Sequence, residues 1–174
     1  QCIKRSVRLH PAFAEETGVE PASRTRFLAS AISKRLQELG KPQEEADLAA
    51  SNFIGILLGG TDQKNPLKSK VLFYVSLEEK EQLTNLILEN WEAALAGEKQ
   101  KSVLEKAAKD YKKAFQKRTS APDIAMFGRM LAEDPNLNMD AACQVAHAIS
   151  THRVNMEFDF FTAVDDLQEK EQTG

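Results

Sequence analysis

The sequence predicts an α+β fold in which a helical block is inserted between a basic opening and a β-rich end. Apolar residues recur at helical spacing through residues 24–118, whereas the chain beyond Pro122 has no charged helical face. With 174 residues, the chain is long enough for one ordinary domain or two small lobes. Its composition, 42% hydrophobic and 28% charged, is typical of a globular protein.

The composition also bears on membrane spans, disulfide bonds and the cellular compartment of the protein. The longest apolar run, FIGILLGG, is less than half of the roughly 18 residues that a membrane-spanning helix needs. Cys2 and Cys143 lie far apart without a Cys-x-x-Cys motif, so no disulfide framework is predicted. A reducing, cytoplasmic setting follows. Because the chain starts at Gln1 inside a basic helix and ends without a closing element, we expect a fragment of a longer protein.

Charge is segregated along the chain. The net charge of −3 alone argues against nucleic-acid binding. Residues 99–118, however, hold eight basic residues and two acidic ones, and residues 157–171 hold six acidic residues and one lysine. A local basic face attracts phosphate within about 8 Å at physiological salt. The local charge of each stretch is therefore more informative than the net charge of the chain.

The opening residues 1–10 are expected to form a basic helix. On it Lys4 and Arg8 lie together and Arg5 sits about 100° round, with no acid among them. This helix could hold consecutive phosphates, with Gln1 as an amide donor. The alternative is an ordinary charged surface helix. Pro11 ends it, and residues 10–21 are expected to form a loop.

The helical block contains the strongest local signals. Residues 24–39 form an amphipathic pattern, and Pro42 opens a second helix that is apolar nearly all round before Gly59. VLFYV, residues 71–75, is a strand candidate. Ser76 with Glu79 makes a capping box that begins a helix continuing to Gly97. The helix at residues 101–117 has a basic side, usually only a solvated face, and this apolar stripe: Val103, Leu104, Ala107, Ala108, Tyr111, Ala114 and Phe115.

DIAMFGRM and DAACQVAHAISTHRV, beyond Pro122, suggest strands or buried segments. Cys143, His147 and His152 supply zinc-binding groups. Cys143 and His147 would share a face on a strand or a helix, but His152 misses that face in both cases, and no fourth ligand is evident. A buried cysteine and hydrogen-bonded histidines are therefore the default interpretation, and no metal or cofactor is expected.

The acidic stretch near the end of the chain raises a catalytic alternative. Asp159, Asp165 and Asp166 could hold Mg²⁺ for phosphodiester cleavage. Adjacent aspartates on an extended chain point to opposite faces, however, and no Lys or His stands beside them as a proton shuttle. A solvated acidic arm or a partner contact is the alternative. No P-loop or nucleophile elbow is present in the sequence.

Three phenylalanines come directly before these acids, in the sequence FDFF. On a strand, Phe158 and Phe160 face one side and Phe161 the other, so one side can lack a core to enter. An exposed Phe can stack on bases, contributing roughly 1–3 kcal/mol per base. Burial of all three in a core or subunit interface is the alternative.

Two stretches resemble one known family. DIAMFGRM, and AACQVAHAISTHRV with FDFFTAVDDLQE, resemble the CasC-type backbone subunit of Cascade, the type I-E CRISPR surveillance complex. QCIKRSVR is similar to that family's basic helix. The resemblance implies an RRM-like (ferredoxin-like) palm, a helical fingers insertion and a thumb hairpin. It divides the chain into palm helix and loop (residues 1–23), fingers (24–118), palm strands (119–156) and the outgoing thumb arm (157–174).

The resemblance also implies a function. Subunits of this family are not enzymes; they polymerise head to tail along a CRISPR guide RNA, contact other Cascade subunits and present the guide to target DNA in antiviral defence. The residues that match its RNA-binding positions, with Arg129 added only as a neighbour, are Gln1, Lys4, Arg5, Arg8, Arg129, Met130, Phe161 and Thr162. Such contacts suit a guide of any sequence, because they go to phosphate, sugar and base faces. A metal-dependent ribonuclease and a helical protein–protein adaptor are the alternatives.

Overall fold

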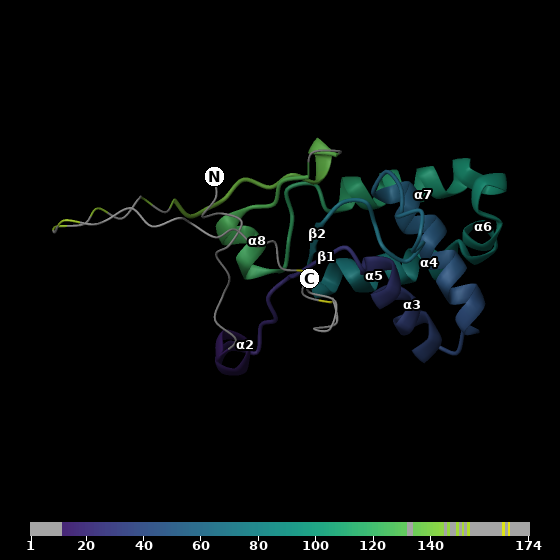
Figure 1. Ribbon diagram of the computed structural model, residues 1–174, viewed down its shortest axis with the longest axis horizontal. Coiled ribbons are helices and arrows are strands. Elements are labelled where there is room, and N and C mark those ends of the chain that lie inside the picture. Colours follow the sequence, from purple (N-terminus) through teal and green to yellow (C-terminus); the bar gives the residue numbers. More distant parts are fainter. Residues whose placement is uncertain are drawn as a thin grey trace.

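The computed structural model describes residues 12–131 and 134–144 and, singly, residues 146, 149, 151, 153, 165 and 167. It is an α+β fold, as the sequence predicts (Figure 1). Its elements, in chain order, are α2 (Ala12–Thr17), β1 (Ser23–Thr25), α3 (Leu28–Glu38), α4 (Gln43–Leu57), β2 (Phe73–Val75), α5 (Leu77–Glu89), α6 (Trp91–Ala96), η1 (Gly97–Gln100), α7 (Lys101–Ala114), α8 (Pro122–Phe127) and η2 (Pro135–Leu137).

Helix α4 lies at the centre of the helical lobe, which we define as residues 28–115. It packs against α3, α5, α6 and α7. Phe53, Ile54 and Leu57 of α4 are buried, which confirms the prediction that its second half is a core helix. No helix of the described residues is long and apolar enough to cross a membrane.

The two strands join the helical lobe to the rest of the chain. Strand β1 pairs with β2 in antiparallel register, with Arg24 opposite Tyr74. β2 confirms the strand predicted from VLFYV. Helices α3 and α4 leave from β1 and return to β2, whereas α5, α6 and α7 follow β2 and lead on to α8 (Figure 1).

Four predicted elements differ from the structure. Residues 23–25, expected to open or flank a helix, form β1, because they pair with β2 instead. The loop expected at residues 10–21 contains the short helix α2. The helix expected to continue from Ser76 to Gly97 breaks at Asn90, whose side chain bonds the Leu86 carbonyl, and resumes as α6. Residues 122–127, expected as a strand or buried segment, form helix α8.

The second compact region, which we call the α8 segment, comprises residues 121–131 and 134–144. Its Ala121 and Ile124 form a small apolar cluster with Ala22, against which Tyr74 and Met139 pack. Its Leu131 and Leu137 belong to the main apolar cluster. Among its described residues the expected palm strands are represented only by an isolated bridge between Arg129 and Met139. The predicted basic helix at residues 1–10 lies outside the described residues.

Candidate nucleic-acid interface

Helix α8 is short because its ends are set by local chemistry. Ala121 is extended and Pro122 occupies the first turn, where its missing N–H costs no hydrogen bond. Gly128 ends the helix with φ of +76°, and a Cβ there would meet the Met139 carbonyl oxygen at 2.6 Å. Only glycine therefore fits both this backbone conformation and this close approach.

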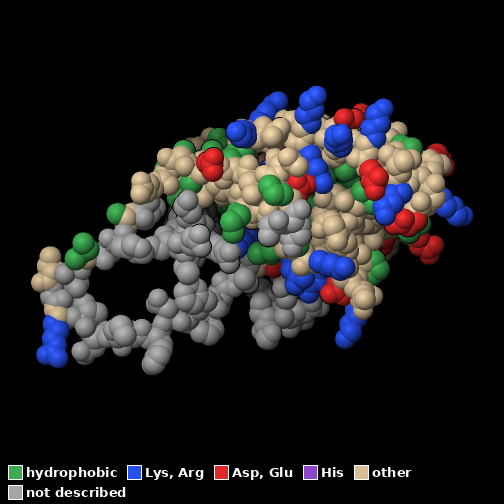
Figure 2. All heavy atoms as spheres, turned by 90° about the horizontal axis from the view of Figure 1, so that it is seen from above, with side chains coloured by type: hydrophobic (Ala, Val, Ile, Leu, Met, Phe, Trp, Pro, Cys, Tyr) green, Lys and Arg blue, Asp and Glu red, His purple; other side chains and the backbone are tan. Residues whose placement is uncertain are grey.

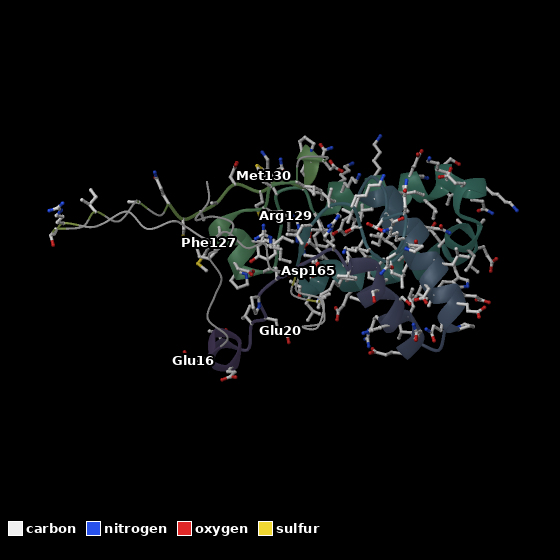
Figure 3. All side chains as sticks on the ribbon, in the orientation of Figure 1. Glu16, Glu20, Phe127, Arg129, Met130 and Asp165 are labelled. Carbon is white, nitrogen blue, oxygen red and sulfur yellow. The ribbon has the colours of Figure 1, made fainter. Side chains whose placement is uncertain are left out.

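The three residues after Gly128 alternate between the inside and the outside. Arg129 is 4% exposed, Met130 68% and Leu131 3%. Arg129 and Met139 exchange both backbone hydrogen bonds, at 3.0 and 2.8 Å, and the Leu131 N–H donates to the Asn138 side chain. This extended backbone turns the Met130 side chain to solvent beside α8 (Figure 3).

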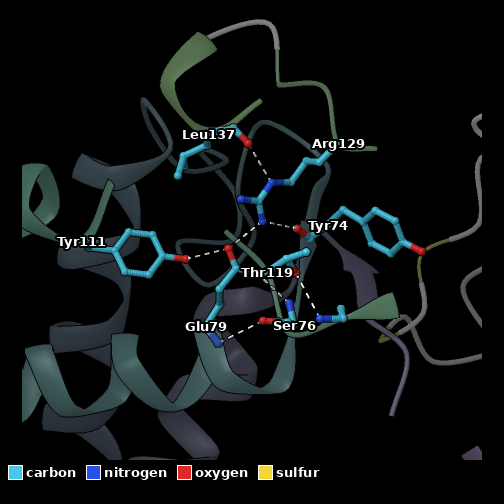
Figure 4. A network of polar contacts seen from close by, with 8 residues as sticks. Tyr74, Ser76, Glu79, Tyr111, Thr119, Arg129 and Leu137 are labelled. Atoms are coloured by element: carbon cyan, nitrogen blue, oxygen red, sulfur yellow. Dashed lines mark hydrogen bonds and ion pairs between the residues drawn. The ribbon is translucent and has the colours of Figure 1, made fainter. Parts of the chain in front are cut away.

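The guanidinium of Arg129 lies inside the protein (Figure 4). Its Nη1 donates to Glu79 Oε1 at 2.6 Å and to the Tyr74 carbonyl at 3.0 Å, and its Nε donates to the Leu137 carbonyl at 2.9 Å. It also stacks over the Phe73 ring, 5.1 Å from the centroid. Nη2 has no hydrogen-bond acceptor among the described residues.

Glu79, the partner of Arg129, is fully buried and held by its own helix. Its Oε2 accepts from the Ser76 N–H at 2.9 Å, and the Ser76 hydroxyl accepts from the Glu79 N–H at 3.1 Å. This is the capping box predicted from the sequence. The Tyr111 hydroxyl lies 3.4 Å from Glu79 Oε1, and burial, together with the Glu79 charge, raises the pKa of Tyr111 well above its ordinary value. Tyr111 is therefore a neutral donor to this carboxylate.

A second carboxylate fixes α8 to the strands. Asp123 is buried, and its two oxygens accept from the Ala22 N–H at 2.9 and 3.0 Å. The Tyr74 hydroxyl donates to the same carboxylate. Tyr74 therefore links both groups: its carbonyl accepts from Arg129 and its hydroxyl donates to Asp123.

Asp165 is the one acid of the stretch at residues 157–171 that lies among the described residues. Its Oδ2 accepts from the Arg26 N–H at 2.7 Å, and its Oδ1 accepts from the Leu167 N–H at 3.1 Å. Both oxygens of this alternative Mg²⁺ ligand are therefore engaged with backbone amides. Asp159 and Asp166, the other acids of that alternative, lie outside the described residues.

Of the predicted RNA-binding residues, the structure describes Arg129 and Met130. Met130 is exposed, whereas Arg129 is buried in an ion pair (Figure 3). An RNA contact by Arg129 stays a prediction that these contacts do not test. The remaining predicted residues lie outside the described part of the chain: Gln1, Lys4, Arg5, Arg8, Phe161 and Thr162.

Cys143 differs from its predicted environment. It is exposed and has a free thiol, whereas the sequence suggested a small buried cysteine. Its N–H donates to the Met126 carbonyl at 2.9 Å, which holds the backbone against the end of α8 and leaves the side chain outside. His147 and His152 lie outside the described residues, and within those residues no cluster of three His, Cys, Asp or Glu side chains could hold a metal.

Basic side chains are spread over the helical lobe rather than gathered in one place (Figure 2). On α7, Lys106, Lys109 and Lys113 are exposed, whereas Lys112 is paired with Asp134 of the α8 segment at 2.6 Å. Acidic side chains lie among them on the face shown. The exposed lysines agree with the solvated basic side expected for this helix.

Sequence reasoning missed the polar partners at the junction. Glu79 is visible in the sequence only as a capping residue, and nothing in the local pattern indicates its ion pair with Arg129, 50 residues away. Asp123 and Tyr74 are likewise separated by 49 residues. The one usable signal for α8 is Ala-Pro-Asp followed by Gly128, the common start and end of a short helix.

Comparison with known proteins extends over the whole chain. The sequence model of the CT1975-like protein family matches residues 1–174. No curated protein matches the sequence. A solved chain described as "CRISPR RNA-guided surveillance complex, pre-nicking" is 29% identical, with a TM-score of 0.62 over 100% of this chain and 48% of that chain.

Another solved chain, described as "CRISPR RNA-guided surveillance complex", is also similar. It is 29% identical and has a TM-score of 0.59, over 77% of this chain and 42% of that chain. This chain therefore spans less than half the length of either solved chain.

Proposed function

Because this chain belongs to the CT1975-like protein family, we propose that it is part of a non-catalytic subunit that binds the guide RNA of a CRISPR surveillance complex. Membership of this family confirms the resemblance to a Cascade-type subunit that was inferred from the sequence motifs. The assignment to type I-E stays a prediction. The observation that carries the proposal is the match over all of this chain to a chain of an RNA-guided surveillance complex.

The described surface supports this proposal at Met130. Met130 is 68% exposed between two buried neighbours, so its apolar side chain is available to a partner. The flexible, polarisable thioether can pack on any base face and so does not read sequence. A guide of changing sequence needs such contacts, supplemented by basic groups on phosphates such as Lys4, Arg5 and Arg8.

The finer parts of the proposal concern assembly. We propose that copies polymerise head to tail along the guide RNA, that the target DNA strand pairs with the guide, and that cleavage is left to another protein. The palm, fingers and thumb boundaries at residues 24, 119 and 157 belong to this proposal, as does its cytoplasmic location. The contacts of Asp165 with two backbone amides support a structural acid here over a Mg²⁺ ligand.

Fluorescence anisotropy with a repeat–spacer RNA, measured on the full-length protein across a salt series, tests the proposal. We expect tight binding with a steep salt dependence. Lys4→Glu/Arg8→Glu removes two phosphate contacts, so the slope of log K against log salt should fall by at least about 1.4.

Lys34→Glu/Lys99→Glu is the matched control, because it makes the same charge change at two exposed lysines of the helical lobe. It should leave the slope nearly unchanged. If the full-length protein fails to bind RNA, the helical adaptor becomes the better account. Mg²⁺-dependent cleavage of the RNA that is lost in Asp→Ala variants would instead establish the nuclease.

A further inference from the structure

We infer that the buried Glu79–Arg129 pair is the device that holds Met130 on the outside of the protein, so that Glu79 and Arg129 are positioning residues. The direction of the Met130 side chain can be tested without RNA. The effect of that direction on RNA binding rests on the proposed function.

The first step is the geometry of the backbone on each side of Met130. Arg129 and Leu131 both point inward and are 4% and 3% exposed. In an extended segment, side chains alternate, so two inward neighbours force the residue between them outward. If the Arg129 side chain left its buried site, only Leu131 would still fix the direction of the backbone at Met130.

The second step is how firmly Arg129 is held. Its fork reaches three different parts of the protein: Glu79 at 2.6 Å, the β2 carbonyl of Tyr74 at 3.0 Å and the Leu137 carbonyl at 2.9 Å. A planar guanidinium makes these contacts at fixed angles, which an ammonium group cannot reproduce. The orientation of Arg129 is therefore set relative to α5, β2 and η2 together.

The third step is what holds Glu79. Both of its carboxylate oxygens are engaged, one with the Ser76 N–H in the capping box and the other with Arg129. Helix α5 is part of the helical lobe core through Leu83 and Ile87. The pair consequently ties the backbone next to Met130 to a helix of the main apolar cluster.

Stability alone is a poor reason for this arrangement. A buried ion pair is often no more stabilising than apolar residues of the same size, because both charges lose their hydration. Arg129 Nη2 also has no acceptor among the described residues. Because apolar residues can often replace such a pair without loss of stability, we infer that this pair serves to fix geometry.

Spin labels test the direction of Met130 without RNA. The full-length protein carries Met130→Cys and Asn85→Cys, the latter exposed on α5, with all other cysteines replaced by Ser. The test variant is Arg129→Met/Glu79→Gln, in which Gln keeps the capping box and no buried charge remains. Arg35→Met/Glu38→Gln is the matched control, since it makes the same substitutions at an exposed pair on α3.

We expect a narrow distance distribution in the parent and the control, and at least a twofold broader one in the test variant. Arg129→Lys, which keeps the charge but loses the fork, should give an intermediate width and serves if the double variant folds poorly. An unchanged width in both Arg129 variants would overturn the inference.

RNA binding is then measured on the full-length protein without the cysteine substitutions, so that Met130 is in place. Met130→Ala should weaken binding about tenfold. If Glu79 and Arg129 act through Met130, the test variant combined with Met130→Ala should be no weaker than Met130→Ala alone. Multiplying effects would overturn this coupling. Absence of RNA binding by the parent would overturn the proposed function, while the spin labels would still decide the direction of Met130.

Discussion

The helical lobe and the α8 segment are held together by different interactions. In the lobe, side chains from α3, α4, α5, α6 and α7 form one apolar cluster in which Leu28, Phe53 and Leu83 are fully buried. The α8 segment adds only Leu131 and Leu137 to that cluster, and its Ala121 and Ile124 pack with Ala22 in a smaller one. Its polar anchors are Arg129 and Asp123, which are bonded to groups far away in sequence.

This difference has a consequence for tolerance to change. Hydrophobic packing is non-directional, so a lobe residue can be replaced by another of similar volume. A buried hydrogen-bonded charge needs its partners at fixed angles, so its conservative replacement is not conservative. The lobe therefore supplies a rigid body, and the α8 segment supplies a defined direction for the residue that we propose to contact RNA.

Arg129→Met is expected to have the largest effect on folding. It leaves the Glu79 carboxylate buried without its partner, so the free energy of unfolding should fall by about 3–5 kcal/mol. Chemical denaturation of the full-length protein measures this loss. Adding Glu79→Gln should recover most of it, since the buried charge is then removed. A double variant as unstable as Arg129→Met would contradict this account.

Leu83→Ala tests the lobe in the same way. Leu83 is fully buried in the apolar cluster, and its truncation should lower the free energy of unfolding by about 2–5 kcal/mol. Leu83→Met should cost under about 1.5 kcal/mol, because volume is nearly conserved. The comparison between the regions fails if Leu83→Met costs as much as Arg129→Lys.

The same distinction explains what the sequence predicts. Helices α3, α4 and α7 follow from their apolar periodicity, and the capping box of Ser76 and Glu79 marks the start of α5. These signals are local: each depends on residues three or four apart, and the core needs only that apolar faces meet. Of the predicted site, Met130 was identified by resemblance; its side chain is exposed, and its contact with RNA stays a prediction.

The parts that sequence reasoning missed depend on long-range partners. Residues 23–25 become a strand only because β2 lies beside them, and Arg129 is buried only because Glu79 neutralises it. Helix α8 is too short to show an apolar periodicity. The one local signal was Pro122 at its start and Gly128 after its end. No spacing rule connects residues some 50 positions apart.

Asp165→Ala tests a connection between the acidic stretch and the strands. The Arg26 N–H should lose its acceptor at 2.7 Å, so its amide should exchange with solvent several-fold faster. We expect a loss of about 1 kcal/mol in the local opening free energy, typical of one hydrogen bond. Hydrogen exchange of the peptide that contains Arg26 measures it. Asp110→Ala, an exposed acid on α7, is the control and should leave this amide unchanged.

The smallest effect is expected where the two regions meet in a partly hydrated ion pair. Lys112 of α7 lies 2.6 Å from Asp134 Oδ2 in the α8 segment. Burial alone raises the pKa of Asp134, but the hydrogen bond and charge of Lys112, with the Asn136 amides, outweigh burial and hold this pKa below its ordinary value. A carboxyl whose folded pKa is depressed stabilises the protein above its unfolded pKa, which is about 3.9.

Stability from Asp134 should therefore be present at neutral pH and be lost as pH falls below about 4, through the folded pKa. In denaturant unfolding between pH 7 and pH 3, the parent should lose more stability than Asp134→Asn, and the difference between them should shrink as the pH falls. Salt should weaken it as well, because the pair retains contact with water. A difference that stays constant down to pH 3 would mean that the regions are joined by Arg129 and Asp123 without help from this pair.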